Sequence, residues 1–196
     1  MDVITHYDLL IDENNDPFQD PPVLREYMDK WDGTVFINAL ELDRYQSVLE
    51  IGIGTGRLAA RVAPNCMHLT GIDISPKTIK RAKENLRSYT NISYICDDFT
   101  THDFTESFDV IYSSLTMMHF SNKQDVISKI DTLLKIGGIF CLSIDKSQSE
   151  YIDIGTRKLK IYPDTPDNIV SLIKTTKMNL AGIFETDNAY IILSNK

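Results

Sequence analysis

The chain has 196 residues, of which 42% are hydrophobic and 24% charged, so it can bury one core of ordinary size. Its formal net charge is −8, and no run of Lys and Arg is long enough to follow a phosphate backbone, so we expect no nucleic-acid partner. Residues 1–10 lack the apolar run of a signal peptide, and no stretch approaches the ~18 consecutive apolar residues of a membrane span. We therefore expect a cytoplasmic protein without a membrane partner.

The three cysteines, Cys66, Cys96 and Cys141, predict neither a disulfide framework nor a metal site. Their number is odd, and each is flanked by residues typical of a core, so we expect buried free thiols in a reducing compartment. No pair has the spacing of metal ligands, and we expect no bound metal.

Residues 1–46 are predicted to form a helical cap ahead of the main domain. The segment is acidic and contains Asp16-Pro17 and Pro21-Pro22. After the double proline, apolar residues recur at helical spacing at Val23, Leu24, Tyr27, Met28 and Trp31. Asp32-Gly33 should end this helix, and a second short helix is expected over residues 34–42.

From residue 47 onward, short apolar runs alternate with helical segments. Strands are expected at residues 48–51, 67–72, 92–96, 108–112 and 139–144. Helices are expected at residues 57–62 and 76–86 and after Thr165-Pro166. Another should run from a capping box at Ser121 to Leu134, and Gly137-Gly138 should end it. Ser75 should cap the second of these helices.

This alternation predicts an α/β fold of the doubly wound, Rossmann-like type, with a mostly parallel sheet covered on both faces. Residues 180–185 and 189–193 should form a closing hairpin that adds an antiparallel C-terminal strand to the sheet. Residues 151–162 read as an inserted strand near the rim of the site, on which Arg157 is expected to face solvent, with contact to an acidic substrate as the alternative.

A glycine-rich turn follows the first predicted strand, in the run Glu50-Ile51-Gly52-Ile53-Gly54-Thr55-Gly56-Arg57. Such a turn needs backbone angles that a Cβ disfavours, and it lets a ligand approach the main chain. Asp73 ends the next strand at the spacing of a carboxylate that holds ribose hydroxyls. Dinucleotide-binding proteins carry a third glycine where this chain has Arg57, and the extra glycine here is Gly56 instead.

The pattern resembles the class I S-adenosylmethionine (SAM)-dependent methyltransferases of the small-molecule type. Their Asp/Glu-x-Gly-x-Gly-x-Gly motif is matched by Glu50, Gly52, Gly54 and Gly56, and their second-strand carboxylate by Asp73. The family's adenine-facing aspartate aligns with Asp98, with Asp97 as the alternative. The fourth-strand segment 108–115 and the Leu134-Lys135-x-Gly137-Gly138 turn complete a resemblance that covers roughly residues 46–145.

The resemblance implies SAM as cofactor, S-adenosylhomocysteine as product, and a set of contacts. The loop from Gly52 through Ile53 and Gly54 to Gly56 would pack against the amino acid portion, and Glu50 would attract its ammonium group, through water. Asp73 would accept the ribose hydroxyls, and Asp98 the adenine amine. Ile74 and Phe99 would cover the adenine, with the Phe99 N–H near a ring nitrogen, and Ser113 would complete the site.

The acceptor should lie beyond the carboxyl ends of the strands, near residues 116–120. His119 is the candidate general base, with a packing role as the alternative, and Met118 is a candidate lining residue. His6-Tyr7-Asp8 resembles an N-terminal Tyr-Asp pair of many small-molecule methyltransferases, so Tyr7 is expected to reach the cofactor or the substrate.

We therefore expect one methyltransferase domain over residues 1–196, divided into the cap (1–46), a SAM-binding core (47–145), and a rim insertion with the last helix and hairpin (146–196). It would transfer a methyl group to a small-molecule acceptor by in-line displacement. Residues 113–116 lack the Asn/Asp-Pro-Pro-Tyr/Phe motif of base-amine methylases, which disfavours those acceptors. The alternatives are a non-catalytic SAM-binding protein, a protein methyltransferase and a nucleotide-dependent oxidoreductase; the acceptor and the oligomeric state stay open.

Overall fold

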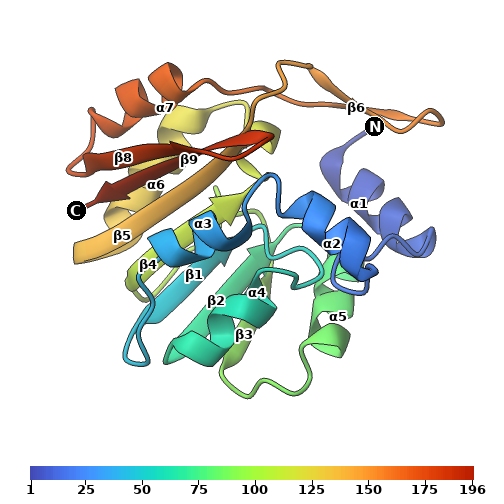
Figure 1. The fold of residues 1–196 in the computed structure, drawn as a ribbon, viewed down its shortest axis with the longest axis horizontal. Coiled ribbons are helices and arrows are strands. Elements are labelled where there is room, and N and C mark those ends of the chain that lie inside the picture. The colour runs from blue at the N-terminus through green and yellow to red at the C-terminus, as the bar shows by residue number, and fades with distance from the viewer.

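The computed structural model describes all residues from 1 to 196 and contains a central seven-stranded sheet (Figure 1). The strand order is β3-β2-β1-β4-β5-β9-β8, in which the first five strands are parallel, β9 is antiparallel to β5, and β8 is antiparallel to β9. The strands are β1 (Ser47–Ile51), β2 (His68–Asp73), β3 (Ile92–Cys96), β4 (Phe108–Ser114), β5 (Leu134–Asp145), β8 (Asn179–Glu185) and β9 (Ala189–Asn195). The predicted doubly wound α/β fold with its antiparallel C-terminal hairpin is confirmed.

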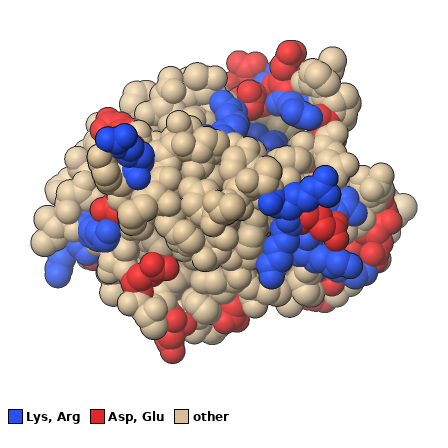
Figure 2. Space-filling model, turned by 90° about the horizontal axis from the view of Figure 1, so that it is seen from below, with Lys and Arg blue, Asp and Glu red and all other residues tan.

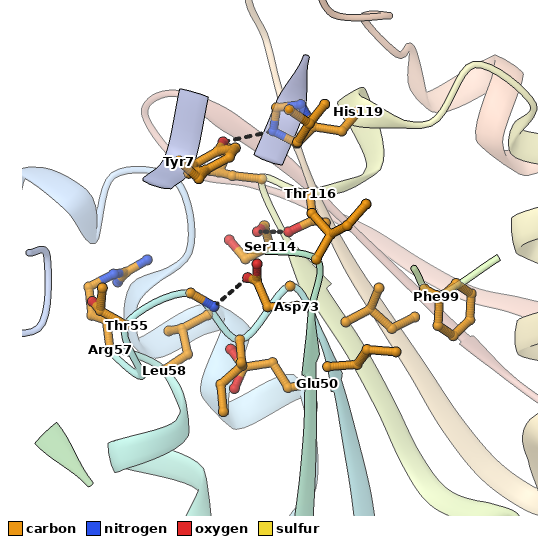
Figure 3. Close-up of a pocket in the computed structure, with 18 of the residues that line it drawn as sticks. Tyr7, Glu50, Thr55, Arg57, Leu58, Asp73, Phe99, Ser114, Thr116 and His119 are labelled. Carbon is orange, nitrogen blue, oxygen red and sulfur yellow. Dashed lines mark hydrogen bonds between the residues drawn. The ribbon is translucent and has the colours of Figure 1, made fainter. Parts of the chain in front are cut away.

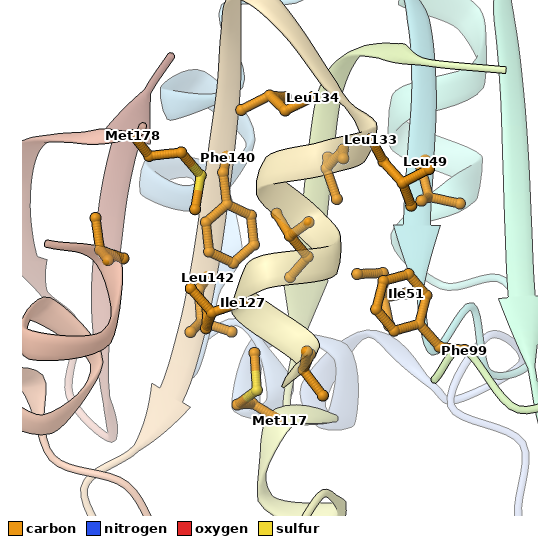
Figure 4. Packing of buried hydrophobic residues seen from close by; sticks show 14 of the residues in the cluster. Leu49, Ile51, Phe99, Met117, Ile127, Leu133, Leu134, Phe140, Leu142 and Met178 are labelled. Atoms are coloured by element: carbon orange, nitrogen blue, oxygen red, sulfur yellow. The ribbon is translucent and has the colours of Figure 1, made fainter. Parts of the chain in front are cut away.

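Helices cover both faces of the sheet, and each face has its own apolar cluster. One cluster packs under α3 (Gly33–Ala39), α4 (Ala59–Val62) and α5 (Pro76–Asn85) and contains Phe36 and Val48. The other packs under α6 (Lys123–Leu133) and α7 (Pro166–Ile173), and Ile127, Leu49 and Phe140 all belong to it (Figure 4). All five residues of β1 are buried, as expected for a parallel strand covered on both faces.

Three helices precede the first strand: α1 (Val3–Asp12), α2 (Pro22–Met28) and α3. The sequence predicted the last two but not α1. Asp2 caps α1, because its carboxylate accepts a hydrogen bond from the Thr5 backbone N–H at 2.9 Å. Asp8 then fixes α1 to the start of α5, since its carboxylate accepts a hydrogen bond from the Ser75 hydroxyl at 2.7 Å. Residues 1–46 thus contain one more helix than expected.

Around α6, the predicted boundaries were wrong. Asn122 rather than Ser121 caps the helix, and β5 begins at Leu134, so Gly137 and Gly138 lie inside a strand instead of ending a helix. Gly137 has φ +81°, and its N–H donates to the carbonyl of Lys196, which ties the start of β5 to the C-terminus. The glycines thus allow an irregular strand at the sheet's end, where β4 and β5 also shift register.

The remaining elements are short: β6 (Tyr151–Asp153), β7 (Lys158–Lys160) and the 3-10 turns η1 (Ala63–Asn65) and η2 (Met117–His119). The inserted strand expected at residues 151–162 is thus an antiparallel pair, β6 and β7. Cys66 and Cys141 are buried free thiols as predicted, but Cys96 is exposed, because it ends the edge strand β3. None of the helices is long and apolar enough to cross a membrane.

Positive charge on the surface is interspersed with negative charge (Figure 2). Helix α5 carries many basic residues, yet its Lys77 pairs with Asp12 and its Arg81 lies 3.1 Å from Asp16. These pairs hold the N-terminal segment against α5, so part of the helix's charge is neutralised within the chain.

Candidate functional site

A cavity of about 360 Å³ opens at the carboxyl ends of β1, β2 and β4 and is closed on one side by α1 (Figure 3). This volume lies in the range of small-molecule and cofactor sites. Ten residues singled out from the sequence line it: Tyr7, Glu50, Gly52, Ile53, Gly54, Asp73, Ile74, Asp98, Phe99 and His119. Their positions in the chain range from 7 to 119, and the parallel strands bring them together because their carboxyl ends share one edge.

Three other predicted site residues lie outside this lining. The Ser113 hydroxyl donates to the Ile51 carbonyl at 3.0 Å, so it binds the neighbouring strand. Gly56 packs against α5, where a Cβ would come within 2.5 Å of the Leu86 side chain. Met118 lines a second cavity, of about 130 Å³, rather than the first.

The glycine-rich loop has the backbone that its sequence predicts. Gly52 and Gly54 have φ of +80° and +56°, values that side chains with a Cβ rarely adopt. A Cβ on Gly52 would lie 2.0 Å from the Thr116 hydroxyl oxygen, whereas one on Gly54 would meet no atom within 4 Å. Gly52 therefore permits contact with the end of β4, and Gly54 presents bare backbone to the cavity.

Two carboxyl groups face the cavity from neighbouring strands. The Asp73 carboxylate accepts hydrogen bonds from the backbone N–H groups of Gly54 and Ser75, both at 3.0 Å; burial raises its pKa, while these donors oppose the rise. Glu50 is 3% exposed and accepts a hydrogen bond from the Tyr112 hydroxyl at 2.7 Å. Burial raises the pKa of Glu50 to about 8, so a cation in the cavity would favour its ionised form.

Asp97 and Asp98 lie together at the carboxyl end of β3, and both line the cavity. The Asp98 carboxylate accepts hydrogen bonds from the Thr100 N–H and hydroxyl, at 2.8 and 2.7 Å, and Asp97 binds His102 at 2.9 Å. Phe99 is buried and also belongs to the core cluster under α6. Both candidates for the adenine-facing aspartate therefore remain beside the cavity.

An ion pair that the sequence did not predict joins the cap to the glycine-rich loop. The Arg57 guanidinium donates to both oxygens of the buried Asp32 carboxylate, and the Ser114 hydroxyl donates to the same carboxylate at 2.9 Å. Arg57 occupies the position of the third glycine in dinucleotide-binding proteins, and this departure is the feature of the sequence that marks the residue out. Its ion pair with Asp32 holds the helical side of the loop against the start of α3.

Leu115, just past the end of β4, carries backbone strain that the sequence did not predict. Leu115 has φ +55°, and it lines both the main and the second cavity. Such strain in a residue with a Cβ persists only where the surroundings enforce it, and it is concentrated at functional sites.

Tyr7 and His119 meet over the cavity, from α1 and η2 (Figure 3). The Tyr7 hydroxyl lies 2.8 Å from His119 Nε2, and the two rings are perpendicular. Burial lowers the pKa of His119 to about 4, so the imidazole is neutral at physiological pH. If the Tyr7 hydroxyl donates to Nε2, the ring proton is on Nδ1, which has no hydrogen-bond partner in the protein.

Comparison with known proteins identifies a family. A family model described as a methyltransferase domain matches residues 49–142. The chain is 29% identical over 131 residues to malonyl-[acyl-carrier protein] O-methyltransferase 2 of Ilyobacter polytropus, covering 64% of this chain and 50% of that protein. It is 28% identical over 141 residues to phosphoethanolamine N-methyltransferase of Triticum aestivum, covering 69% of this chain and 27% of that protein. The chain thus spans half or less of these relatives' length.

Solved structures share the whole fold. The N-methyltransferase NodS of Bradyrhizobium japonicum WM9, in complex with S-adenosylhomocysteine, superposes with a TM-score of 0.72 at 20% identity, covering 97% of each chain. The magnesium protoporphyrin IX methyltransferase of Synechocystis PCC 6803 with bound SAM gives 0.77 at 16% identity, covering 99% of this chain and 95% of that one. At such identities the likeness concerns the fold.

Proposed function

Because this chain belongs to the class I SAM-dependent methyltransferase family, we propose that it transfers the methyl group of SAM to a small-molecule acceptor. The observation that carries this proposal is the single cavity in which the glycine-rich loop, Asp73 and His119 meet. Two relatives are named as an O- and an N-methyltransferase, so the family resemblance leaves the accepting atom open.

The groups that face the cavity suit this cofactor. Gly54 offers open backbone, and Glu50 and Asp73 place carboxyl groups beside a ligand that carries an ammonium and a sulfonium charge. The loop would hold the amino acid portion, Asp73 the ribose hydroxyls, and Asp98, with Asp97 as the alternative, the adenine amine. When bound, SAM supplies a methyl group on a positively charged sulfur, which is open to in-line attack by a lone pair.

Tyr7 and His119 are proposed to close the acceptor side of the cavity. Their hydrogen bond holds α1 against η2, which would exclude water and orient the acceptor. A pKa of about 4 leaves His119 unprotonated at neutral pH but makes it a weak base. His119 therefore suits an acceptor that needs little help in losing a proton, such as a neutral amine or a carboxylate that is already ionised.

Calorimetric titration with SAM, and separately with NADH, tests the cofactor assignment. We expect SAM binding without a response to NADH, and a Kd raised by more than about tenfold in Asp73→Ala, because a ligand group bound by a charge-assisted hydrogen bond loses its partner. Asp103→Ala, which removes an exposed carboxylate away from the cavity, is the matched control. An unchanged Kd in Asp73→Ala would reject the ribose assignment, and absence of SAM binding would reject the proposed function.

Turnover against a panel of small carboxylates, amines and phenols then tests the reaction. His119→Ala should lower turnover more than SAM affinity, because His119 lies on the acceptor side. Equal activity in this variant would return His119 to a packing role. SAM binding without turnover on small molecules or basic proteins would support the non-catalytic alternative.

A further inference from the structure

A group of buried nitrogen atoms behind the acceptor side of the cavity lacks hydrogen-bond partners. In the whole chain, five buried side-chain polar atoms lack a hydrogen-bond partner, and three of them are nitrogens: Nδ1 of His6, Nδ1 of His119 and Nε of Arg157. An unpaired buried donor loses its hydrogen bond to water without gaining another, so buried polar groups almost always have a partner. The Arg157 Nε always carries a proton, and each histidine Nδ1 carries one in the tautomer whose Nε2 is the acceptor, so in that state all three are donors without an acceptor.

These three residues come from distant segments that meet at α1: His119 binds Tyr7 within the helix, and Arg157 binds Glu13 just past its end. His6 lies in α1, His119 in η2, and Arg157 in the turn between β6 and β7. The Tyr7 ring stacks edge-on with both histidines, with ring centres 5.2 Å from His6 and 5.4 Å from His119. His119 and Tyr7 line the cavity itself, so the group adjoins the place proposed for the acceptor.

Charge interactions also link the three residues. Burial and then the positive charge of Arg157 lower the pKa of His6, which the Glu13 carboxylate opposes. Burial, followed by the charges of His6 and Lys123, lowers the pKa of His119. The group is therefore a set of nitrogens in a positive environment that holds the imidazoles neutral.

The carboxylates of this region are already engaged. Glu13 takes both terminal nitrogens of Arg157, at 2.5 and 2.8 Å, and leaves Nε without a partner. On the α6 side, Lys123 lies 3.3 Å from Asp164 and donates to the carbonyls of Phe120 and Tyr162. No acceptor within the chain serves the three nitrogens, so a ligand that pairs with them must bring acceptor oxygens and would be favoured by negative charge.

We propose that His6, His119 and Arg157 form a subsite for an oxyanion of the acceptor molecule, a carboxylate or a phosphate group. This rests on the proposed function, and it names the acceptor as an acidic small molecule. Oxyanions satisfy several N–H donors at once, and charge-assisted hydrogen bonds from Arg and His are the strong ones. Because the three nitrogens are buried, the oxyanion enters as α1 moves away from the β6–β7 turn, and it takes the place of Glu13 on Arg157.

The test follows the histidine ring resonances of the full chain by NMR, during titration with inorganic phosphate and, separately, with malonate. The chain has four histidines, so His68 and His102 serve as internal controls in the same spectra. We expect saturable shifts at His6 and His119 with either probe or both, and a rise in the pKa of both rings, because a bound anion favours imidazolium. Comparison of the two probes tells carboxylate from phosphate.

Two variants make the test specific. Arg157→Gln should lower the affinity for the phosphate or malonate probe by about tenfold or more, as expected for loss of a hydrogen bond to a charged partner. Glu13→Gln should raise the affinity for the same probe, because the carboxylate that competes for Arg157 is gone while the length of the side chain is kept. Unchanged His68 and His102 resonances show that each variant is folded.

Absence of shifts, equal shifts at all four histidines, or equal affinity in Arg157→Gln would each overturn the subsite. Calorimetry with S-adenosylhomocysteine separates this failure from that of the proposed function. If the nucleoside product binds and the oxyanion does not, only the subsite is rejected. If the oxyanion binds and the nucleoside product does not, the methyltransferase assignment is rejected and the anion site stands.

Discussion

Glu50 should make the stability of the ligand-free protein fall as pH rises. Its carboxyl group is buried beside Tyr112, and its pKa is raised from an ordinary 4.5 to about 8. The folded protein therefore holds a proton that the unfolded chain releases at neutral pH. The sign follows directly: this contribution is complete below pH 4.5 and is lost progressively as the pH rises toward 8.

The size of the effect follows from the same two pKa values. Integrating the proton-binding difference gives a loss of about 2.5 kcal/mol in the free energy of unfolding between pH 5 and pH 7. For a chain of this length, each kcal/mol shifts the Tm by about 2–4 °C, so the loss corresponds to about 5–10 °C. Saturating SAM should reduce the loss, because a cation in the cavity favours the ionised carboxylate.

Thermal unfolding from pH 5 to pH 8, followed by circular dichroism, checks this for the wild type, Glu50→Gln and Glu26→Gln. Gln at position 50 can still accept the hydrogen bond from Tyr112 but does not titrate. Glu26 is an exposed carboxylate on α2, and its replacement should leave the pH profile unchanged. All other titrating groups are shared by the wild type and Glu50→Gln, so their contributions cancel in the difference between the two profiles. If the wild type and Glu50→Gln show parallel profiles, the explanation from the buried carboxyl group is wrong.

Four further variants test separate parts of the site. Gly56→Ala should lower the Tm, through strain of about 1–3 kcal/mol at φ +97° and the contact of the new Cβ with Leu86. Gly54→Ala should lower SAM affinity more than the Tm, because its Cβ would meet no protein atom. A larger loss of Tm in Gly54→Ala and of SAM affinity in Gly56→Ala would contradict the assignment of the loop. Asp32→Asn should lower the free energy of unfolding in urea by about 3–5 kcal/mol, because it removes the buried charge that faces Arg57 and leaves only the exposed Asp29 carboxylate, 3.7 Å away. A loss no larger than that of Asp29→Asn would refute this. Tyr7→Phe should lower kcat with SAM affinity unchanged, as measured by turnover and calorimetry; an equal loss in both would place Tyr7 on the cofactor.

The parts of the fold set by local sequence were predictable. The turn from β1 into the loop combines a buried apolar run with closely spaced glycines, and Ser75 caps α5 as expected, with its hydroxyl accepting from the Thr78 N–H. Both features depend on residues within a few positions of one another. At the end of α6, the glycine pair gave the wrong boundary, because its conformation is set by the pairing of Gly137 with Lys196, at the far end of the chain.

The contacts that complete the site were not predictable, because they join residues far apart in the chain. Tyr7 and His119 were each singled out from the sequence, but their hydrogen bond spans 112 positions. Asp32 was interpreted only as part of a helix end, and nothing local pairs it with Arg57. A single sequence indicates which residues are chemically suited to a site, whereas tertiary packing determines which of them meet.

Helix α1 should be the first element of the fold to open, because polar contacts rather than apolar burial hold it in place. Of its ten residues only His6 is buried, while Asp8, Asp12 and Glu13, just past its end, bind partners on α5 and the β6–β7 turn. Exposed ion pairs contribute only about 0–1 kcal/mol each, far less than the buried clusters on either side of the sheet. Amide hydrogen exchange should therefore be faster in α1 than in α6, and SAM should slow it, because Tyr7 lines the cavity. Equal protection in α1 and α6 without ligand would show that the helix is part of the core, and access to the cavity would then require another route.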